Sequence, residues 1–323
     1  MNAHPKTLVD AIKYFADPDN CREYMVSIRW PDGVSCPSCG SEKVYYVASR
    51  KGWECATRHP HRKFTLKTGT IFEDSPIGLD KWLPTVWMIV NMKNGVSSHE
   101  LAKSLGVTQK SAWFMLHRIR LAMQDQTGGM LSGTVEVDET YIGGKARNMH
   151  ASQREAKINR PGRTHFGKVA VMGLLERHDS KDKPTKVRTK LLRSVKGPEL
   201  QTLVRQNVEA GSTVNTDALH SYHGLMADYM HNVIDHAEAY VSDEVHTNTI
   251  ENFWSCLKRG LHGTYISVEP FHLFRYLDEQ AFRYNNRKGL SDADRFSLAI
   301  TGIVGRRLTY KDLIGAQNAP NGN

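Results

Sequence analysis

The chain has 323 residues, of which 40% are hydrophobic and 24% are charged, which is typical of a folded globular protein with two or three domains. Its formal net charge of +9 suits a partner that carries many phosphates. Only five cysteines occur, and three of them are clustered, which excludes a disulfide scaffold and favours a reducing, cytosolic setting.

No segment of the sequence predicts export or membrane insertion. The first 13 residues lack the long apolar core of a secretory signal. The most apolar run, Trp82–Met92, is too short to span a bilayer and contains Pro84. We therefore expect a cytoplasmic protein without a membrane partner.

Residues 36 to 61 contain a metal-ligand pattern. Cys36 and Cys39 flank a two-residue knuckle, and a predicted hairpin separates them from Cys55. A histidine then completes a tetrahedral set with no open position, so we predict a zinc ribbon that holds one structural Zn²⁺. We prefer His59 as the fourth ligand because it is closer to Cys55, and His61 is the alternative. Unliganded cysteines in a loop would be the competing interpretation.

Two helices joined by a tight turn are predicted between residues 98 and 120. Ser98 can cap the first helix, Gly106 makes the turn and Thr108 caps the second helix. This pattern is typical of a helix-turn-helix, whose second helix lies in the major groove of DNA, although an ordinary helical hairpin is the alternative. The side chains of the second helix that we expect to contact DNA are Gln109, Lys110, Arg118 and Arg120.

The stretch from residue 145 to residue 168 is polar and basic, and it lacks the periodicity of a core element. We interpret it as a loop that contacts DNA phosphates, beginning with Lys145 and Arg147. A solvated loop without a partner is the alternative.

The next segment predicts three strands, then a helix, a strand, a helix, a strand and a final helix. This succession is what a ribonuclease H-like fold needs, an α/β fold in which helices flank a mixed sheet. In that fold the first and fourth strands lie side by side at the centre. The predicted strands are 133–142, 169–175, 187–192, 213–217 and 232–236, and the helices are 197–208, 218–226 and the one that follows residue 246.

Carboxylates occur on the elements that this fold would bring together. Asp138 is on the first strand, Asp217 ends the fourth strand, and Glu251 is on the final helix. Three oxygen ligands suit Mg²⁺ or Mn²⁺ and leave positions open for water and phosphate. Two such ions could serve an in-line phosphoryl displacement. Asp217 could instead cap a helix, and Glu136 or Glu139 could replace Asp138 as a ligand.

The final helix is amphipathic and aims several polar groups in one direction. Glu251, Ser255 and Lys258 fall on one face, because residues three, four and seven apart stack along an α-helix. The alternative is a purely local role, since Asn248 and Glu251 have the spacing of a capping box.

Six motifs carry a family resemblance: VDETYIGGK (137–145), NTD (215–217), HTNTIENFWSCLKRG (246–260), FRYNNR (282–287), TGTIFED (68–74) and CPSC (36–39). With them the chain resembles the DDE transposases of bacterial insertion sequences, of the type with an amino-terminal zinc ribbon and an integrase-like core. The resemblance covers nearly the whole chain and is most specific around Glu251. The ribbon departs from the usual pattern, because a cysteine and a histidine replace the second pair of cysteines.

The resemblance implies that Asp138, Asp217 and Glu251 bind two Mg²⁺ or Mn²⁺ ions, and that water and then a DNA 3′-hydroxyl attack phosphodiesters. Asn248 and Lys258 also match family positions. We assign Asn248 a supporting role near the metals, and Lys258, with Arg259 beside it, contact with DNA phosphate. Double-stranded DNA, from the element ends and the target, is the implied partner of a homodimer or larger assembly at the bacterial nucleoid.

The predicted organisation has four parts: an amino-terminal helix and zinc ribbon (1–72), a helix-turn-helix region (73–127), a ribonuclease H-like catalytic domain (128–290) and a carboxyl-terminal extension (291–323). We expect an insertion-sequence transposase that binds element ends, cleaves DNA and transfers strands. A DNA-binding regulator without catalysis is the alternative, and a nuclease without strand transfer is a third possibility.

Overall fold

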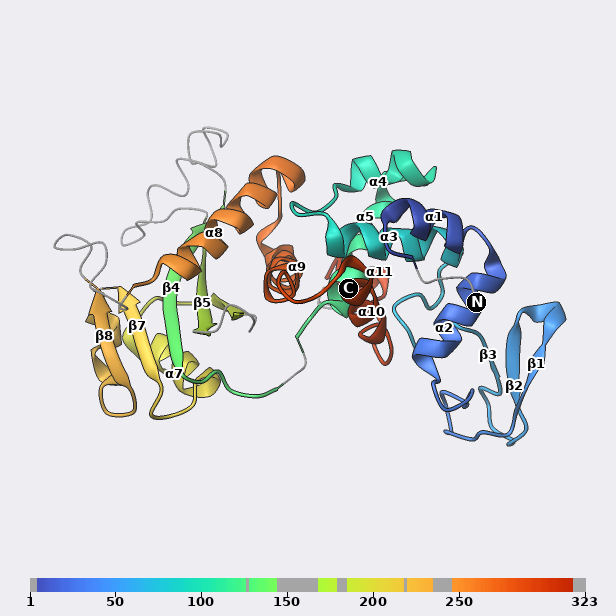
Figure 1. The fold of residues 1–323 in the computed structure, drawn as a ribbon, viewed down its shortest axis with the longest axis horizontal. Helices are drawn as coiled ribbons and strands as arrows, with labels where there is room; N and C mark the ends of the chain where they lie inside the picture. Colours follow the sequence, from blue (N-terminus) through green and yellow to red (C-terminus); the bar gives the residue numbers. More distant parts are fainter. Residues whose placement is uncertain are drawn as a thin grey trace, which may run out of the picture. The chain divides into compact units, whose positions relative to one another are not determined.

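The computed structural model describes residues 5–125, 128–143, 168–178, 185–217, 220–234 and 246–315, and Figure 1 shows their arrangement into helices and strands. The chain divides into two compact units, Met1–Gln124 with Leu290–Asn323, and Asp125–Gly289. Within the described ranges, no helix is long and apolar enough to cross a membrane. Lys145 and Arg147 lie outside the described residues.

The first unit combines helices with a small antiparallel sheet of order β1-β2-β3. The strands are β1 (Val44–Val47), β2 (Gly52–Cys55) and β3 (Lys63–Phe64). The helices are α1 (Leu8–Phe15), α2 (Pro18–Arg29), α3 (Leu79–Asn91), α4 (Ser98–Leu105), α5 (Gln109–Ala122), α10 (Asp292–Thr301) and α11 (Tyr310–Leu313).

Helix α10 contributes an aromatic side chain to the core of the first unit. The Phe296 ring is 1% exposed, and its centroid lies 5.6 Å from Phe15, 5.5 Å from Tyr24 and 5.1 Å from Trp87. Aromatic rings at such separations bury large apolar areas together. Residues from the far end of the sequence therefore complete the core that α1, α2 and α3 begin.

Replacing this ring should destabilise the first unit. Phe296→Ala is expected to lower its free energy of unfolding by about 3–5 kcal/mol, because a buried aromatic side chain is lost and a cavity remains. Urea unfolding of the full chain measures the change. Leu298→Ala, which truncates a 44% exposed side chain on the same helix, is the control. Equal effects of the two substitutions would contradict the packing role of Phe296.

The second unit contains a five-stranded mixed sheet of order β6-β5-β4-β7-β8. The strands are β4 (Thr134–Ile142), β5 (Val169–Arg177), β6 (Lys186–Leu192), β7 (Thr213–Asp217) and β8 (Met230–Ile234). The helices are α7 (Gly197–Asn207), α8 (Asn248–Gly260) and α9 (Leu273–Asn285). The helix predicted for residues 218–226 corresponds to a short 3₁₀ helix, His220–Leu225.

The predicted neighbourhood of the first and fourth strands is confirmed. Strand β4 lies at the centre and pairs parallel with β7, while its other neighbour, β5, is antiparallel. The β4–β7 ladder runs as far as the pair Val137 and Thr216. Asp138 and Asp217 each follow this pair by one residue and therefore extend from adjacent strands toward the same face of the sheet.

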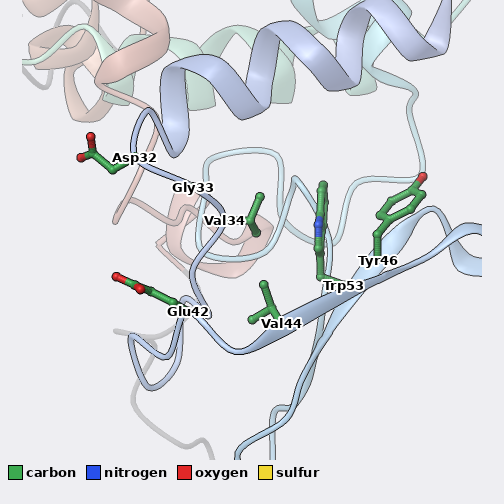
Figure 2. Close-up of a pocket in the computed structure, with 7 residues that line it drawn as sticks. All are labelled: Asp32, Gly33, Val34, Glu42, Val44, Tyr46 and Trp53. Carbon is green, nitrogen blue, oxygen red and sulfur yellow. The ribbon is translucent and has the colours of Figure 1, made fainter.

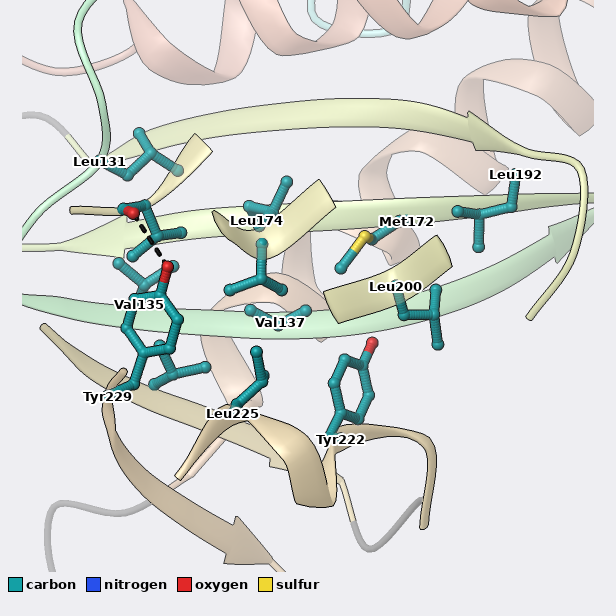
Figure 3. Close-up of a cluster of buried hydrophobic side chains, with 13 residues drawn as sticks. Leu131, Val135, Val137, Met172, Leu174, Leu192, Leu200, Tyr222, Leu225 and Tyr229 are labelled. Carbon is teal, nitrogen blue, oxygen red and sulfur yellow. Dashed lines mark hydrogen bonds between the residues drawn. The ribbon is translucent and has the colours of Figure 1, made fainter. Parts of the chain in front are cut away.

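Helices cover both faces of this sheet, α8 on one and α7 on the other (Figure 1). Successive side chains of β4 point to opposite faces of the sheet, so the strand contributes residues to both helical layers. Val135 and Val137 join the α7 layer, where Figure 3 shows the buried cluster and the hydrogen bond of 3.1 Å from the Tyr229 hydroxyl to the Val208 carbonyl. The intervening residues of β4, which include Asp138, belong to the α8 face.

Helix α9 closes the edge strand of the sheet. The Asn285 side chain accepts a hydrogen bond of 2.8 Å from the Val187 N–H and donates one of 3.0 Å to the Val187 carbonyl. An amide side chain thus replaces the missing neighbour strand at this point of β6, which protects an exposed edge.

Candidate functional site

The predicted zinc ligands converge in the first unit. The ligand atoms of Cys36, Cys39, Cys55 and His59 all lie within 4.8 Å of one another. The Cys39 and Cys55 sulfurs are 3.7 Å apart, and the Cys36 sulfur is 3.4 Å from His59 Nε2. Around a tetrahedral zinc ion these separations should be about 3.8 Å and about 3.6 Å, given metal–sulfur bonds of about 2.3 Å and metal–nitrogen bonds of about 2.0–2.1 Å. His61 is exposed and does not belong to the cluster.

The local chain is shaped to present these thiols. Gly40 has a positive φ of 73°, and its N–H donates to the Cys36 carbonyl at 2.8 Å, which closes the knuckle. Burial acts to raise the pKa of the Cys55 thiol, but hydrogen bonds from His59 and from the Thr57 N–H outweigh it and lower that pKa to about 6. The thiolate, which is the form that binds zinc, is therefore favoured at neutral pH.

One face of the ribbon carries a shallow pocket of about 370 Å³. Figure 2 shows the carboxylates of Asp32 and Glu42 on one side of it and the rings of Trp53 and Tyr46 on the other. Two exposed carboxylates repel phosphate, so this face of the ribbon is a poor surface for a DNA backbone.

Helices α4 and α5 form the predicted pair with a tight turn. Gly106 has a positive φ of 61°, and the Thr108 hydroxyl accepts a hydrogen bond from the Ser111 N–H at the start of α5. The cap of α4 is Ser97, in a capping box with Glu100, and not Ser98 as predicted. A cap one residue earlier leaves the helix and the turn unchanged.

The four polar side chains predicted on α5 divide into two exposed and two buried ones. Gln109 and Lys110 are exposed. Arg118 is 6% exposed and donates hydrogen bonds to the carbonyls of Ile71, Glu73 and Leu308, and Arg120 is fully buried. Buried side chains cannot reach a DNA backbone, so the predicted DNA contacts of Arg118 and Arg120 are wrong. Both arginines belong to the interior of the first unit.

The second unit brings the three predicted catalytic carboxylates into one neighbourhood. Asp138 and Asp217 extend from β4 and β7 toward the face that α8 covers, and Glu251 is exposed in the first turn of α8. Burial raises the pKa of Asp138 to about 6, and the charges of Glu251 and Asp217 add to the effect. Like charges gathered around Asp138 are suited to a divalent cation, which would offset their repulsion.

The carboxylates are less tightly gathered than the zinc ligands. Over the described parts of the chain, the ribbon cluster is the one group in which three or more potential ligand atoms lie within 4.8 Å of one another. The donor set of Asp138, Asp217 and Glu251 nevertheless fits Mg²⁺ or Mn²⁺, because all its atoms are hard oxygens.

The side chain of Asp138 is held at both oxygens. Its Oδ1 accepts a hydrogen bond of 2.8 Å from the Glu139 N–H, and its Oδ2 accepts one of 2.9 Å from the indole N–H of Trp254. Trp254 is one of the buried apolar residues of α8, and its helical spacing alone does not reveal this contact. Gly173, in the middle of an apolar strand, is the one signal of a close approach at this place.

The two rival carboxylates on β4 have different surroundings. Glu136 is fully buried on the α8 face and accepts a hydrogen bond of 2.8 Å from the Ile250 N–H. Glu139 lies on the opposite face, and burial, with the charges of Asp138 and Asp217, raises its pKa to about 8. Its Oε1 is buried without a hydrogen-bond partner among the described residues.

Helix α8 does not begin with the capping box that the spacing of Asn248 and Glu251 offered as an alternative. Its N-cap is Thr247, without a capping side chain, and Asn248 is exposed at the first helical position. The Glu251 side chain accepts a hydrogen bond of 3.3 Å from the Thr247 hydroxyl. Farther along the helix, Lys258 and Arg259 are exposed. The polar face predicted for this helix is therefore accessible.

Comparison with known proteins places both units in one family. A model of the ISXO2-like transposase domain matches residues 130–285, and a model of the transposase zinc-ribbon domain matches residues 16–57, which include the three clustered cysteines but not His59. The chain is 28% identical over 263 residues to an uncharacterized protein in transposable element ISH50 of Halobacterium salinarum, covering 77% of this chain and 85% of that protein. It is also 31% identical over 102 residues to an uncharacterized transposase-like protein of Haemophilus influenzae, covering 31% of this chain and 82% of that protein. The chain thus belongs to the ISXO2-like DDE transposases that carry a zinc ribbon, and the ribbon match together with the three-cysteine, one-histidine cluster supports a structural zinc ion.

Proposed function

We propose that this protein is the transposase of an insertion sequence, which binds the element ends and catalyses metal-dependent cleavage and transfer of DNA strands. One observation carries the proposal. Asp138 and Asp217 extend from neighbouring strands under α8, close enough to each other and to Glu251 for both charges to raise the pKa of Asp138. Carboxylates gathered in this way serve phosphoryl transfer through divalent ions.

The topology supports a ribonuclease H-like assignment for the second unit. Its central strand pairs parallel with the fourth strand and antiparallel with the second, and helices cover both faces. We further propose the four-part organisation 1–72, 73–127, 128–290 and 291–323, with α4 and α5 as a helix-turn-helix. The three-residue connection through Gly106 favours the helix-turn-helix assignment.

Asp138, Asp217 and Glu251 would hold two Mg²⁺ or Mn²⁺ ions, with Asn248 in a supporting role. Bound there, the ions would supply Lewis-acid activation of the attacking oxygen and charge stabilisation of the leaving oxygen. The protein's own part is to fix the carboxylates in place. The hydrogen bonds to both oxygens of Asp138 support that role.

Exposed polar side chains on two helices would meet the DNA. Gln109 and Lys110 lie at the start of α5, where a recognition helix contacts base edges. Lys258 and Arg259 lie near the end of α8 and would bind phosphates. Lys145 and Arg147 are proposed as further phosphate contacts. Two DNA ends must be held together, so a homodimer or larger assembly at the nucleoid in the bacterial cytoplasm is the proposed form.

The test uses the DNA that flanks the reading frame as substrate. Purified protein with Mg²⁺ or Mn²⁺ is expected to produce discrete 3′-hydroxyl ends and joined strands, and Asp217→Ala should produce neither. Specific binding without cleavage in either metal would favour the regulator. Cleavage that never yields joined strands would favour the nuclease.

A further inference from the structure

Strand β4 and helix α8 are joined by two hydrogen bonds between strand carboxylates and helix N–H groups. The Ile250 N–H donates to Glu136 Oε2 at 2.8 Å, and the Trp254 indole N–H donates to Asp138 Oδ2 at 2.9 Å. We propose that Glu136 and Trp254 are positioning residues, which clamp α8 to β4 and so set Glu251 against Asp138. The inference rests on the proposed metal-dependent function, because it concerns the geometry of that same site.

The spacing of the two bonds makes the clamp specific. Glu136 and Asp138 are two residues apart on a strand, a separation of about 6.6 Å on one face. Ile250 and Trp254 are four residues apart on a helix, about 6 Å along one side. Sliding the helix by one residue would rotate it by about 100° and break both bonds. The pair therefore fixes the position and the rotation of α8, and with them the direction of Glu251.

Glu136 contacts the start of α8 through one oxygen and Arg177, at the end of β5, through the other. Its other oxygen, Oε1, lies 3.0 Å from Arg177 Nε, and Arg177 Nη2 donates a hydrogen bond of 3.3 Å to the His246 carbonyl just before the helix. A carboxylate at a helix N-terminus satisfies free N–H groups and is favoured by the helix dipole. Because α8 has no capping side chain of its own, Glu136 supplies that function from the strand. Complete burial beneath the first turn of α8 argues for Glu136 as an anchor and against it as a metal ligand, whereas Asp138 is partly exposed.

Trp254 reaches Asp138 because the neighbouring strand leaves room for its ring. Gly173 of β5 is the cross-strand partner of Asp138. A Cβ atom at Gly173 would lie 2.6 Å from Cζ2 of the indole and 2.8 Å from Cδ1 of Ile250, which is closer than real contacts allow. The indole is 4% exposed and lies directly over this glycine. Glycine at position 173 is therefore needed for the indole of Trp254 to reach Asp138.

The experiment measures Mn²⁺ binding to the full chain without DNA, from the electron paramagnetic resonance signal of free Mn²⁺. Cleavage rate as a function of Mn²⁺ concentration is the second readout. Trp254→Phe keeps an aromatic side chain but replaces the indole and so removes its N–H, and it should weaken Mn²⁺ binding by about tenfold or more, the usual effect of losing a partner of a metal ligand. The concentration for half-maximal cleavage should rise by the same factor. A purely structural defect would lower the active fraction and leave that concentration unchanged.

Trp82→Phe is the matched control. Trp82 is equally buried, and its indole N–H donates to the Ser75 hydroxyl at 3.1 Å in the first unit. Its replacement should leave Mn²⁺ binding unchanged. If Trp254→Phe does not fold, as judged by circular dichroism and thermal melting, Gly173→Ala provides the second test. It retains the indole but displaces it, and the same loss of Mn²⁺ affinity is expected.

Three outcomes separate the clamp from the proposed function. Wild-type Mn²⁺ affinity in folded Trp254→Phe or Gly173→Ala would overturn the clamp while leaving the metal site intact. Wild-type affinity in Asp217→Ala would overturn the metal site itself, and the clamp with it. Glu136→Gln, which keeps an acceptor for the Ile250 N–H, should bind Mn²⁺ within about tenfold of wild type. A loss as complete as that of Asp217→Ala would make Glu136 a ligand and refute its positioning role.

Discussion

Glu251→Gln is expected to abolish strand cleavage and strand transfer while DNA binding stays at the wild-type level. Glutamine keeps the size of the side chain but removes the charge that would hold a divalent ion. Losing about 4 kcal/mol of transition-state stabilisation corresponds to about a thousandfold fall in the cleavage rate. Glu251 is exposed on α8, so the substitution opens no cavity and should not affect folding.

The measurement pairs a single-turnover cleavage assay with a gel-shift assay on the same DNA. Glu269→Gln is the control, since Glu269 is another exposed glutamate of the second unit and lies outside the proposed site. It should cleave at the wild-type rate. A Glu251→Gln protein that still cuts normally would refute the assignment of this carboxylate. Equal loss of binding and cleavage would point to a DNA-contact role instead.

The fold of the second unit was predictable because its signals are local and periodic. Alternating residues in β4 and the short apolar run of β5 indicate strands, and the succession of elements suits a fold in which the first and fourth strands, β4 and β7, are neighbours. The shared face of Asp138 and Asp217 follows from that neighbourhood, since residues at matching positions of adjacent parallel strands point to the same face of the sheet. The approximate location of the carboxylate site therefore required no knowledge of side-chain contacts.

The contacts that orient the site could not be predicted, because they join residues far apart in the sequence. Asn248 and Glu251 have the spacing of a capping box, yet the start of α8 is capped by Glu136, 114 residues before Ile250. Arg118 and Arg120 looked like surface residues of a DNA-binding helix. Arg118 instead satisfies carbonyls as distant as that of Leu308, which a sequence pattern cannot reveal.

Loss of the zinc ion should unfold the ribbon without unfolding the second unit. The ribbon has strands of four, four and two residues, too few to be stable alone, and its apolar contacts centre on Trp53, Phe64 and Trp30. Structural zinc contributes about 10–16 kcal/mol in small zinc-binding peptides, so metal binding supplies most of the folding energy in such a module. Cys36→Ser is therefore expected to lose the metal and to make the ribbon sensitive to protease.

Two neighbouring histidines provide the sharpest form of this experiment. His59→Ala removes a predicted ligand, whereas His61→Ala alters an exposed side chain two residues away. Zinc content by atomic absorption should fall from about one ion per chain to near zero in the first variant and stay unchanged in the second. Zinc lost from His61→Ala and retained by His59→Ala would reverse the ligand assignment. A ribbon that stays protease-resistant after chelation would show that its aromatic core, and not the metal, holds the strands together.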